Sequence, residues 1–437
     1  MLNKAKGLIL LGLIIALNTF TGLYSQNITK SPYSIIGVGD IVFAGNTANY
    51  TMGQVTQGRR GIYNINMLNP ASYSGLLITN IEAGATYSQG HFKGSAQSND
   101  VNTAWIAYLN FAVPIGNKGK QGISFGISPF SGVGYNIWTA DSIPNDSPAY
   151  IPYQDYMKGR GGLSQFYFGY GLKVHRNISL GLNANYIFGQ TKNTTQRLIP
   201  SQYFMFNTNE DKINYIHGWT YDLGIQIHDT LSLGKGTKAK DYEWVLGATL
   251  TPASNLSVEQ NYILRSLPIG STSGIKDTVF ENSGLNGTIN APMSWKVGCS
   301  FGQLEKWQIA ADIKGTNWSK YRSFGASDSL RNSIGIGIGG SFTPDFRSAK
   351  NLLKRVEYRA GFRYEQSNLS VNGTGVNVWA LTAGFGIPLA KSRSKLNLGF
   401  EYMERGTTDN GLIQENYFRV IVGISFADKW FYRHRYD

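Results

Sequence analysis

From about residue 76 onward, apolar and polar side chains alternate with a period of two rather than 3.6. The pattern is sharpest just after Lys354, where bulky or apolar residues alternate with charged residues or glycine. There Val356, Tyr358, Ala360, Phe362 and Tyr364 alternate with Glu357, Arg359, Gly361, Arg363 and Glu365. A period of two is typical of a β-strand with one apolar face, so the sequence predicts an all-β fold.

An alternating apolar face packs either in the core of a soluble sandwich or against lipid around a membrane barrel. Composition favours the barrel, because aromatic residues reach 13% and charged residues only 15%, below the value of about 25% that is usual for soluble domains. After the first 20 residues no long apolar run exists. A closed barrel is the other architecture that satisfies its backbone in lipid. We therefore predict a transmembrane antiparallel β-barrel, with a soluble all-β sandwich as the alternative.

The first residues have the order of an export signal. Lys4 and Lys6 precede the apolar run Gly7–Leu17, which is too short to span a bilayer, and the small residue Ser25 fits the position before a cleavage site. Residues 1–25 are predicted to be a signal peptide, and the mature protein is predicted to reside in the outer membrane. Cys299 is the single cysteine, so no internal disulfide can form.

About 14 alternating segments follow one another, and an even number is what bacterial barrels require. We place them at 77–87, 102–114, 121–134, 162–174, 178–190, 218–228, 242–265, 291–302, 307–318, 332–342, 355–365, 377–388, 395–404 and 415–426. The seventh is long enough to be two pieces. The barrel is thus predicted over 77–426, with a periplasmic tail at 427–437.

Short turns and long loops alternate along these segments, with long loops predicted at 135–161, 191–217 and 266–290. Long loops are extracellular and short turns periplasmic in such barrels. Basic residues gather on the short-turn side: Lys118, Lys120, Arg176, Lys235, Lys238, Lys240, Arg347, Lys350, Lys354, Lys391, Arg393 and Lys395. This basic rim fits the phosphates of outer-membrane lipids or an acidic periplasmic partner, and no motif of a nucleic-acid-binding fold accompanies it.

The last segment, 417–426, has an apolar face that ends in an aromatic residue. Phe418, Ile424 and Phe426 lie on this face and Gly423 lies opposite. Barrel-assembly machinery reads a terminal strand of this kind, so these four residues are the predicted insertion signal and that machinery is a predicted partner during biogenesis.

Residues 26–76 do not alternate and are rich in Gly, Asn, Thr and Tyr. The stretch is long enough to form a plug inside the lumen, and a periplasmic extension is the alternative. In the plug, Arg59 and Arg60 are expected near the acids Glu357 and Glu401.

Three stretches resemble the FadL family of 14-stranded outer-membrane channels for fatty acids and other hydrophobic compounds. They are Asn69-Pro70-Ala71, the segment Ala291–Gly298, and Trp307–Ile313 with Asn317-Trp318-Ser319. Ser31–Ser34, Gly37–Asp40 and the aromatic-basic tail resemble the Bacteroidota branch. The resemblance covers nearly the whole mature chain and implies that Asn69, Pro70 and Ala71 end an N-terminal hatch. Ser72 departs from the pattern, and the family's ligand-contacting residues have no counterparts that can be placed here.

The resemblance also implies that a shift of the hatch releases ligand sideways at a kinked third strand. Pro129 in this strand cannot donate to a ladder, and proline in sheets is confined to edges, strand starts and bulges. Gly126 weakens the same strand. We therefore expect a lateral opening at Gly126, Ser128, Pro129 and Phe130, and a bulge without a passage is the alternative.

Charged residues of both signs fall on the inward faces of the later segments. They are Lys296, Asp312, Lys314, Glu357, Arg359, Arg363, Glu401 and Arg419. Near balance of the two signs predicts paired charges that brace a filled lumen, whereas an ion-selective pore would more often show one sign.

The sequence gives little support for an enzyme, a metal site or a cofactor. Gly122-Ile123-Ser124-Phe125-Gly126 matches the G-x-S-x-G motif of a nucleophile elbow, but it lies inside a strand, where the strand-to-helix turn that the motif requires is missing. Gly335, Gly337 and Gly339 alternate with isoleucines and predict an inward-facing glycine stripe rather than a dinucleotide loop. The five histidines show no metal-ligand spacing.

Two functions fit these observations. The first is a plugged channel that takes up hydrophobic small molecules, with lateral release at the third strand. The second is a non-transporting barrel that serves as a subunit of an outer-membrane assembly or secretion complex, with a periplasmic or membrane protein as partner.

The insertion signal can be tested at its last aromatic residue. Phe426→Asp places a charge on the lipid face near the interface, where the direct cost is only roughly 0–1 kcal/mol. A large loss of assembled barrel, measured on unboiled gels of the membrane fraction, is expected because recognition fails. Normal surface levels of this variant would show that the signal does not end at Phe426.

Overall fold

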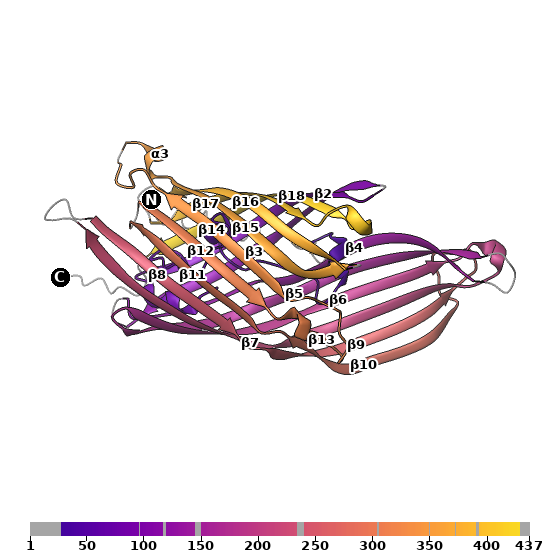
Figure 1. Cartoon of the computed structure of the whole chain (residues 1–437). Helices are drawn as coiled ribbons and strands as arrows, with labels where there is room; N and C mark the ends of the chain where they lie inside the picture. Colours follow the sequence, from indigo (N-terminus) through magenta and orange to yellow (C-terminus); the bar gives the residue numbers. More distant parts are fainter. Residues whose placement is uncertain are drawn as a thin grey trace, which may run out of the picture.

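The computed structural model describes residues 28–428 except 96, 117–118, 145–149, 234–239, 304–305, 349, 372 and 390–392. The predicted signal peptide, the tail from residue 429 and the basic residues Lys118, Lys235, Lys238 and Lys391 lie outside this part. The described chain forms one antiparallel sheet that closes on itself (Figure 1). Its wall strands are β2 (Thr79–Lys93), β3 (Ser98–Ile115), β4 (Gln121–Ile143), β5 (Ile151–His175), β6 (Ile178–Leu198), β7 (Asn207–Leu233), β8 (Lys240–Thr251), β9 (Ser254–Leu267), β10 (Asp277–Ala291), β11 (Ser294–Gln303), β12 (Trp307–Thr316), β14 (Ser333–Phe342), β15 (Glu357–Val371), β16 (Thr374–Pro388), β17 (Lys395–Arg405) and β18 (Gln414–Asp428).

Two pairs of these strands each form one long wall strand that is interrupted in the middle. We call each wall strand, interrupted or not, a stave. β8 and β9 both pair with β7, and they are separated by Pro252 and Ala253. β11 and β10 pair with β8 and β9 respectively, and Pro292 and Met293 separate them. Each break contains a proline, which cannot donate to a ladder. The wall therefore has 14 staves, as predicted, and the seventh is in two pieces.

The last strand closes the barrel onto the first. β18 pairs with β2 from Gln414↔Lys93 to Asp428↔Thr79, so residues 427–428 continue the wall rather than begin the tail. Phe418 is exposed on the outward face of β18, and Gly423 faces inward. Outward faces around the wall are rich in exposed Leu, Ile, Phe, Tyr and Trp, which is typical of a barrel surrounded by lipid.

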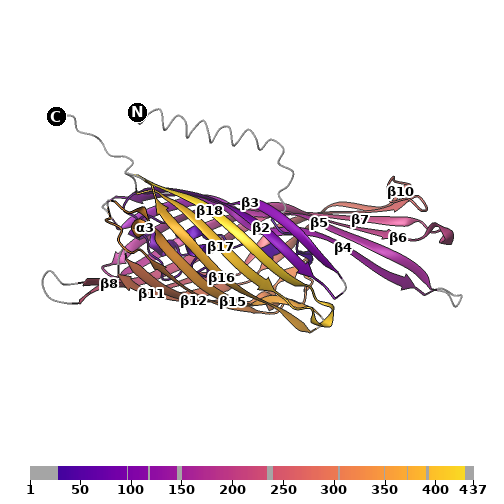
Figure 2. The ribbon, with the colours of Figure 1, turned by 90° about the horizontal axis from the view of Figure 1, so that it is seen from above.

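The predicted long loops are mostly strand, and those predictions were wrong. β4, β5, β6, β7, β9 and β10 continue past the other strands as a curved sheet, which we call the extension (Figure 2). Within it, β4 and β5 pair out to Ile143↔Ile151, and β6 and β7 out to Arg197↔Thr208. The connections left at the tip include residues 199–206, which contain η3 (Ser201–Tyr203), and residues 268–276. The alternation there was masked by Pro, Asn and Thr, residue types that usually mark loops.

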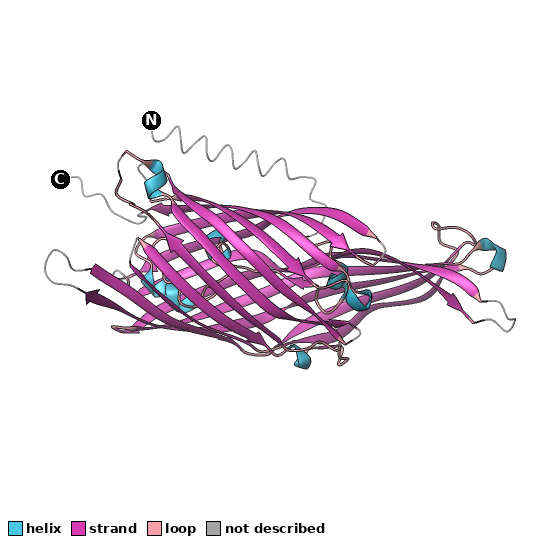
Figure 3. Ribbon diagram, turned by 45° about the horizontal axis from the view of Figure 1, so that its top comes forward, coloured by secondary structure: helices cyan, strands magenta, loops and turns pink. Residues whose placement is uncertain are grey.

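Residues 28–76 run through the inside of the barrel with little regular structure (Figure 3). They form η1 (Pro32–Ile35), the short strand β1 (Asp40–Ile41), α2 (Thr47–Tyr50) and η2 (Pro70–Gly75). Outside this segment, the minor elements are η5 (Trp318–Lys320), β13 (Arg322–Ser323), α3 (Leu352–Arg355) and η6 (Asp409–Gly411). No helix among the described residues is both long and apolar enough to cross a bilayer.

Candidate functional site: the plugged lumen and the β3–β4 seam

The N-terminal segment 28–76, called the plug here, is hydrogen-bonded to strands all around the wall. Residues on β2, β3, β6, β7, β8, β11, β12, β16 and β17 take part. On one side the Tyr50 hydroxyl donates to Glu401 on β17 at 3.0 Å, and on another Ser74 donates to Ser179 on β6 at 2.9 Å. Buried polar groups need such partners, so the wall and the plug satisfy each other.

Inward glycines let the plug backbone touch the wall. A Cβ at Gly339 on β14 would collide with the Met52 carbonyl, and one at Gly361 on β15 would collide with Met52 and Gly53. The predicted glycine stripe on β14 is therefore the surface on which residues 52–53 lie.

The hatch motif occupies a second glycine-lined surface. Asn69 caps η2, because its side chain accepts from the Ala71 amide, and its Nδ2 donates to the Gln57 carbonyl at 3.2 Å. Asn69 is fully buried. A Cβ at Gly181 on β6 would meet the backbone of Pro70, so this turn lies flat against the wall. Its role as a moving hatch stays a prediction.

The most buried charge cluster centres on Glu401. Arg363 on β15 pairs with this carboxylate at 3.3 Å and Arg419 on β18 at 2.9 Å, and Tyr50 of the plug donates to it. The side chain of Glu401 is fully buried. Removing one partner of such a pair leaves an uncompensated charge and is strongly destabilising, so this cluster braces plug and wall together.

The remaining predicted lumen charges form separate groups rather than one network. Glu357 binds Arg359 at 2.8 Å and Lys395 at 2.8 Å, and Lys314 pairs with Glu365. Asp312 instead accepts the backbone amides of Thr56 and Gln57 in the plug, at 2.5 and 2.9 Å. Within the described residues Lys296 forms no ion pair, and it lines the central cavity.

The two plug arginines lie apart, which corrects the expectation for them. Arg59 donates to the Ala48 carbonyl and is close enough to Glu357 to interact electrostatically. Arg60 points to the other side of the lumen, where it donates to Gln226 on β7 at 3.2 Å. Neither forms an ion pair with Glu401, whose two ion-pair partners, Arg363 and Arg419, lie on the wall.

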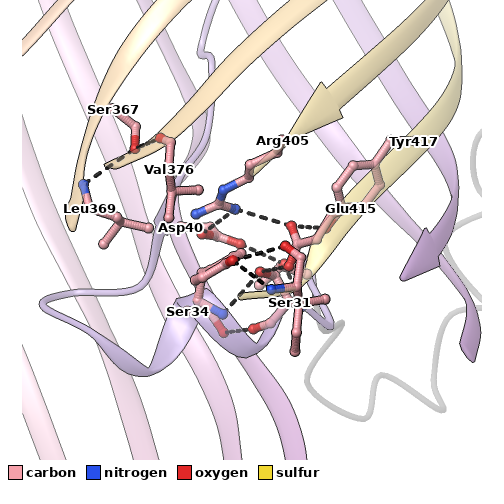
Figure 4. A network of polar contacts seen from close by, with 12 residues as sticks. Ser31, Ser34, Asp40, Ser367, Leu369, Val376, Arg405, Glu415 and Tyr417 are labelled. Carbon is pink, nitrogen blue, oxygen red and sulfur yellow. Dashed lines mark hydrogen bonds and ion pairs between the residues drawn. The ribbon is translucent and has the colours of Figure 1, made fainter. Parts of the chain in front are cut away.

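A charge cluster that the sequence analysis missed ties the start of the plug to the last two strands (Figure 4). Arg405 on β17 contacts Asp40 at 3.0 Å and Glu415 on β18 at 3.6 Å. Ser31 donates to Glu415, and Thr29 donates to Asp40 at 2.7 Å. The signal available in the sequence was the resemblance of Ser31–Ser34 and Gly37–Asp40 to a family branch, because nothing local indicates a contact more than 350 residues away.

The wall changes partners at the third strand. β3 and β4 pair only from Ile115↔Gln121 to Leu109↔Ile127, so β4 leaves β3 just before Ser128. From there β1 of the plug takes the place of β3, because Asp40 and Ile41 pair with Gly132 and Ser131. We call the unpaired boundary between β3 and β4 the seam. Pro129 lies at its start, beside a register irregularity between β4 and β5.

The predicted residues of the lateral opening do not all face the seam. Ser128 is buried and accepts from Gln165 at 3.2 Å. Gly126 lies in the part of β4 that still pairs with β3, where a Cβ would collide with the Leu109 carbonyl. Pro129 and Phe130 line a cavity of about 460 Å³, which continues past Trp105 and Ala107 to the charged residues Lys296 and Asp312.

No group of His, Cys, Asp and Glu in the described residues has the arrangement of a metal site. Cys299 is exposed. Ser124 and Gly126, from the rejected nucleophile-elbow spelling, lie within strand β4.

Comparison with protein families decides the relationship. A family model described as BamG matches residues 6–437. The chain belongs to the BamG family. No curated protein matches it.

Solved structures show that this BamG-family chain has the FadL-like fold. The Ralstonia pickettii toluene transporter TbuX superposes with a TM-score of 0.55 at 13% identity, over 88% of this chain and 99% of that one. The P. putida toluene transporter TodX gives 0.55 at 14%, over 90% and 100%. A Pseudomonas aeruginosa FadL homologue gives 0.53 at 12%, over 87% and 97%. The FadL resemblance was thus correct for the fold, whereas the matching family is BamG.

The fit of the plug can be tested at two neighbouring glycines on opposite faces of β14. Gly339→Ala puts a methyl group against the Met52 carbonyl, so we expect a loss of stability of about 1–3 kcal/mol and a higher single-channel conductance. In Gly340→Ala the methyl group would lie 3.4 Å from the Gln308 carbonyl, an ordinary contact. Equal behaviour of the two variants in thermal unfolding and in planar bilayers would show that the plug is not seated on Gly339.

Proposed function

We propose that the chain is an outer-membrane barrel that acts as a non-transporting subunit of the barrel-assembly machinery. The observation that carries this proposal is the BamG family match along nearly the whole chain, since the family name points to that machinery. The apolar outward faces of the wall support residence in a membrane.

The plug supports a role other than conduction. It is bonded to both halves of the wall, through Glu401 and Asp312 on one side and Gln226 and Ser179 on the other. Opening a passage along the barrel axis would break many buried hydrogen bonds at once. Each buried group left without a partner costs about 1–3 kcal/mol, so a plug held in this way suits a scaffold better than an open pore.

The extension supports an assembly role as well. Six strands continue beyond the wall on one side only. The sheet surface that they present there is not needed to close the barrel, so it is free to contact another protein. The basic rim at the opposite end, which includes Lys120, Arg347 and Lys354, offers a second surface for a protein partner.

The assembly role predicts stable partners and a defect in other barrels. With an affinity tag inserted after Gly274 in the exposed tip connection 268–276, gentle extraction should yield a complex that contains the machinery's central barrel in fixed ratio. Depletion of the chain should lower the heat-modifiable fraction of other outer-membrane barrels, with unchanged uptake of hydrophobic compounds. Recovery of the tagged chain alone, together with normal levels of other barrels after depletion, would contradict the proposal.

A second candidate is a channel for hydrophobic compounds, favoured by the seam and the cavity that meets it. Trp105, Ala107, Pro129 and Phe130 make the lining apolar beside the seam. A solute could leave there into the membrane once β1 of the plug moves away from β4, with which it pairs at Ser131 and Gly132.

The channel candidate is tested by narrowing the cavity from β3. Ala107→Phe fills space beside the seam, so uptake of a labelled fatty acid or alkylbenzene should fall several-fold if solute passes there. Ala104→Phe is the matched control, because Ala104 is exposed and does not line the cavity. Equal uptake by both variants and the parent protein would remove the channel from consideration, and the assembly role would be unaffected.

A further inference from the structure

The outward face of the extension changes character row by row along β5, β6 and β7. Cross-strand pairing places Phe166, Tyr186 and Trp219 in one row, and the rings of Tyr186 and Trp219 are 5.0 Å apart. Six residues further along each strand, roughly 20 Å, the row on the same face consists of Arg160, Lys192 and Ile213. An aromatic row followed by a basic one is the order expected where a barrel leaves the hydrocarbon and meets lipid headgroups.

The basic row contains two like charges in direct opposition. Arg160 on β5 is the cross-strand partner of Lys192 on β6, and like charges in this arrangement destabilise a sheet. Lys158 lies on the same face, one row further out, opposite Thr194. Within the described part of the chain neither Lys158 nor Arg160 forms an ion pair or a side-chain hydrogen bond, and both are exposed. Lys158 and Arg160 are therefore left for a bound anion to pair with.

The buried carboxylate of Asp211 holds two cations of this face, Lys192 and Arg265, in place. Asp211 on β7 binds Lys192 at 3.0 Å and Arg265 on β9 at 3.2 Å, and it accepts from the Thr194 hydroxyl at 2.6 Å. Burial alone would raise the pKa of the Asp211 carboxyl, but the Thr194 hydrogen bond and the charges of Lys192 and Arg265 outweigh it and keep the pKa below its ordinary value. Four cations thus face one acid, which leaves a net positive site.

The cluster also has a recess and an aromatic border. A cavity of about 310 Å³ lies between the side chains of Tyr156, Lys158, Arg160, Lys192, Thr194, Gln196, Asn209 and Asp211. Trp138 on β4 is 59% exposed and lies beside Tyr156, with ring centroids 4.4 Å apart and the two rings tilted by 34°. Amphipathic rings of this type favour the boundary between lipid and water.

We propose that this recess binds a phosphate group of the lipopolysaccharide in the outer leaflet, with Lys158, Arg160 and Lys192 as its cationic ligands. The acyl chains would lie along the aromatic row below, and the sugar would meet Trp138 and Tyr156. The site requires that the extension points to the cell surface, as long connections do in outer-membrane barrels, and it depends on neither candidate function above.

Binding of lipid A to the purified full-length protein in detergent tests the site. Native mass spectrometry with bisphosphorylated lipid A should show a retained lipid, and the dephosphorylated form should not be retained. Lys158→Gln/Arg160→Gln should weaken binding by roughly 30-fold, since each basic side chain near an anionic surface contributes about 5-fold. Both residues are exposed and unpaired, so this variant should fold normally, as shown by heat-modifiable migration.

The matched control removes the same charge elsewhere on the extension. Lys212→Gln/Lys276→Gln changes one residue on the opposite face of β7, paired with Glu210, and one at the tip, which lies over the ring of Phe206. This control should bind lipid A as the parent protein does. Equal binding by both double variants would overturn the proposal, and displacement of the lipid by excess inorganic phosphate alone would show a free-anion site instead.

Discussion

The rest of the structure depends on how the lumen is filled. Eight staves leave an interior that side chains can fill, and 16 or more leave a water channel, so a wall of 14 staves encloses more space than its own side chains can occupy. The plug supplies the missing volume. Glycines such as Gly181 and Gly339 leave room on the inward surface for the plug backbone to lie against the wall. Elsewhere polar side chains of the wall project inward and bond to the amides and carbonyls of the plug.

The buried charges follow from the same requirement. An ion in a lumen shielded from water needs a partner, and each acid of the later strands has one. Glu401 is bound by arginines from β15 and β18, and Glu357 by Arg359 of its own strand and Lys395 of β17. Asp312 is bound by the plug backbone. The Arg405 cluster extends this arrangement to the beginning of the plug. The wall and the plug therefore depend on each other, because the buried polar groups of each find part of their partners on the other.

The period of two made the wall predictable strand by strand, because each stave has one apolar face over its middle. It failed beyond the apolar band, where both faces are polar and segments such as Asn207–His217 look like loops although they pair along their length. The glycine stripe on β14 and the inward charges were predictable from alternation. The pairing of Asp40 with Arg405 was not, because it depends on where an irregular segment settles after the barrel has closed.

The extension and the seat of the plug share the same strands. β5, β6 and β7 run without interruption from the tip to the inward surface under η2, where Gly171 and Gly181 contact Pro70. A hydrogen-bonded sheet resists stretching and shear far more than it resists twisting. The tip and the turn at Asn69 are therefore joined by three continuous strands, so a change in the twist of the extension would also change the surface on which this turn lies.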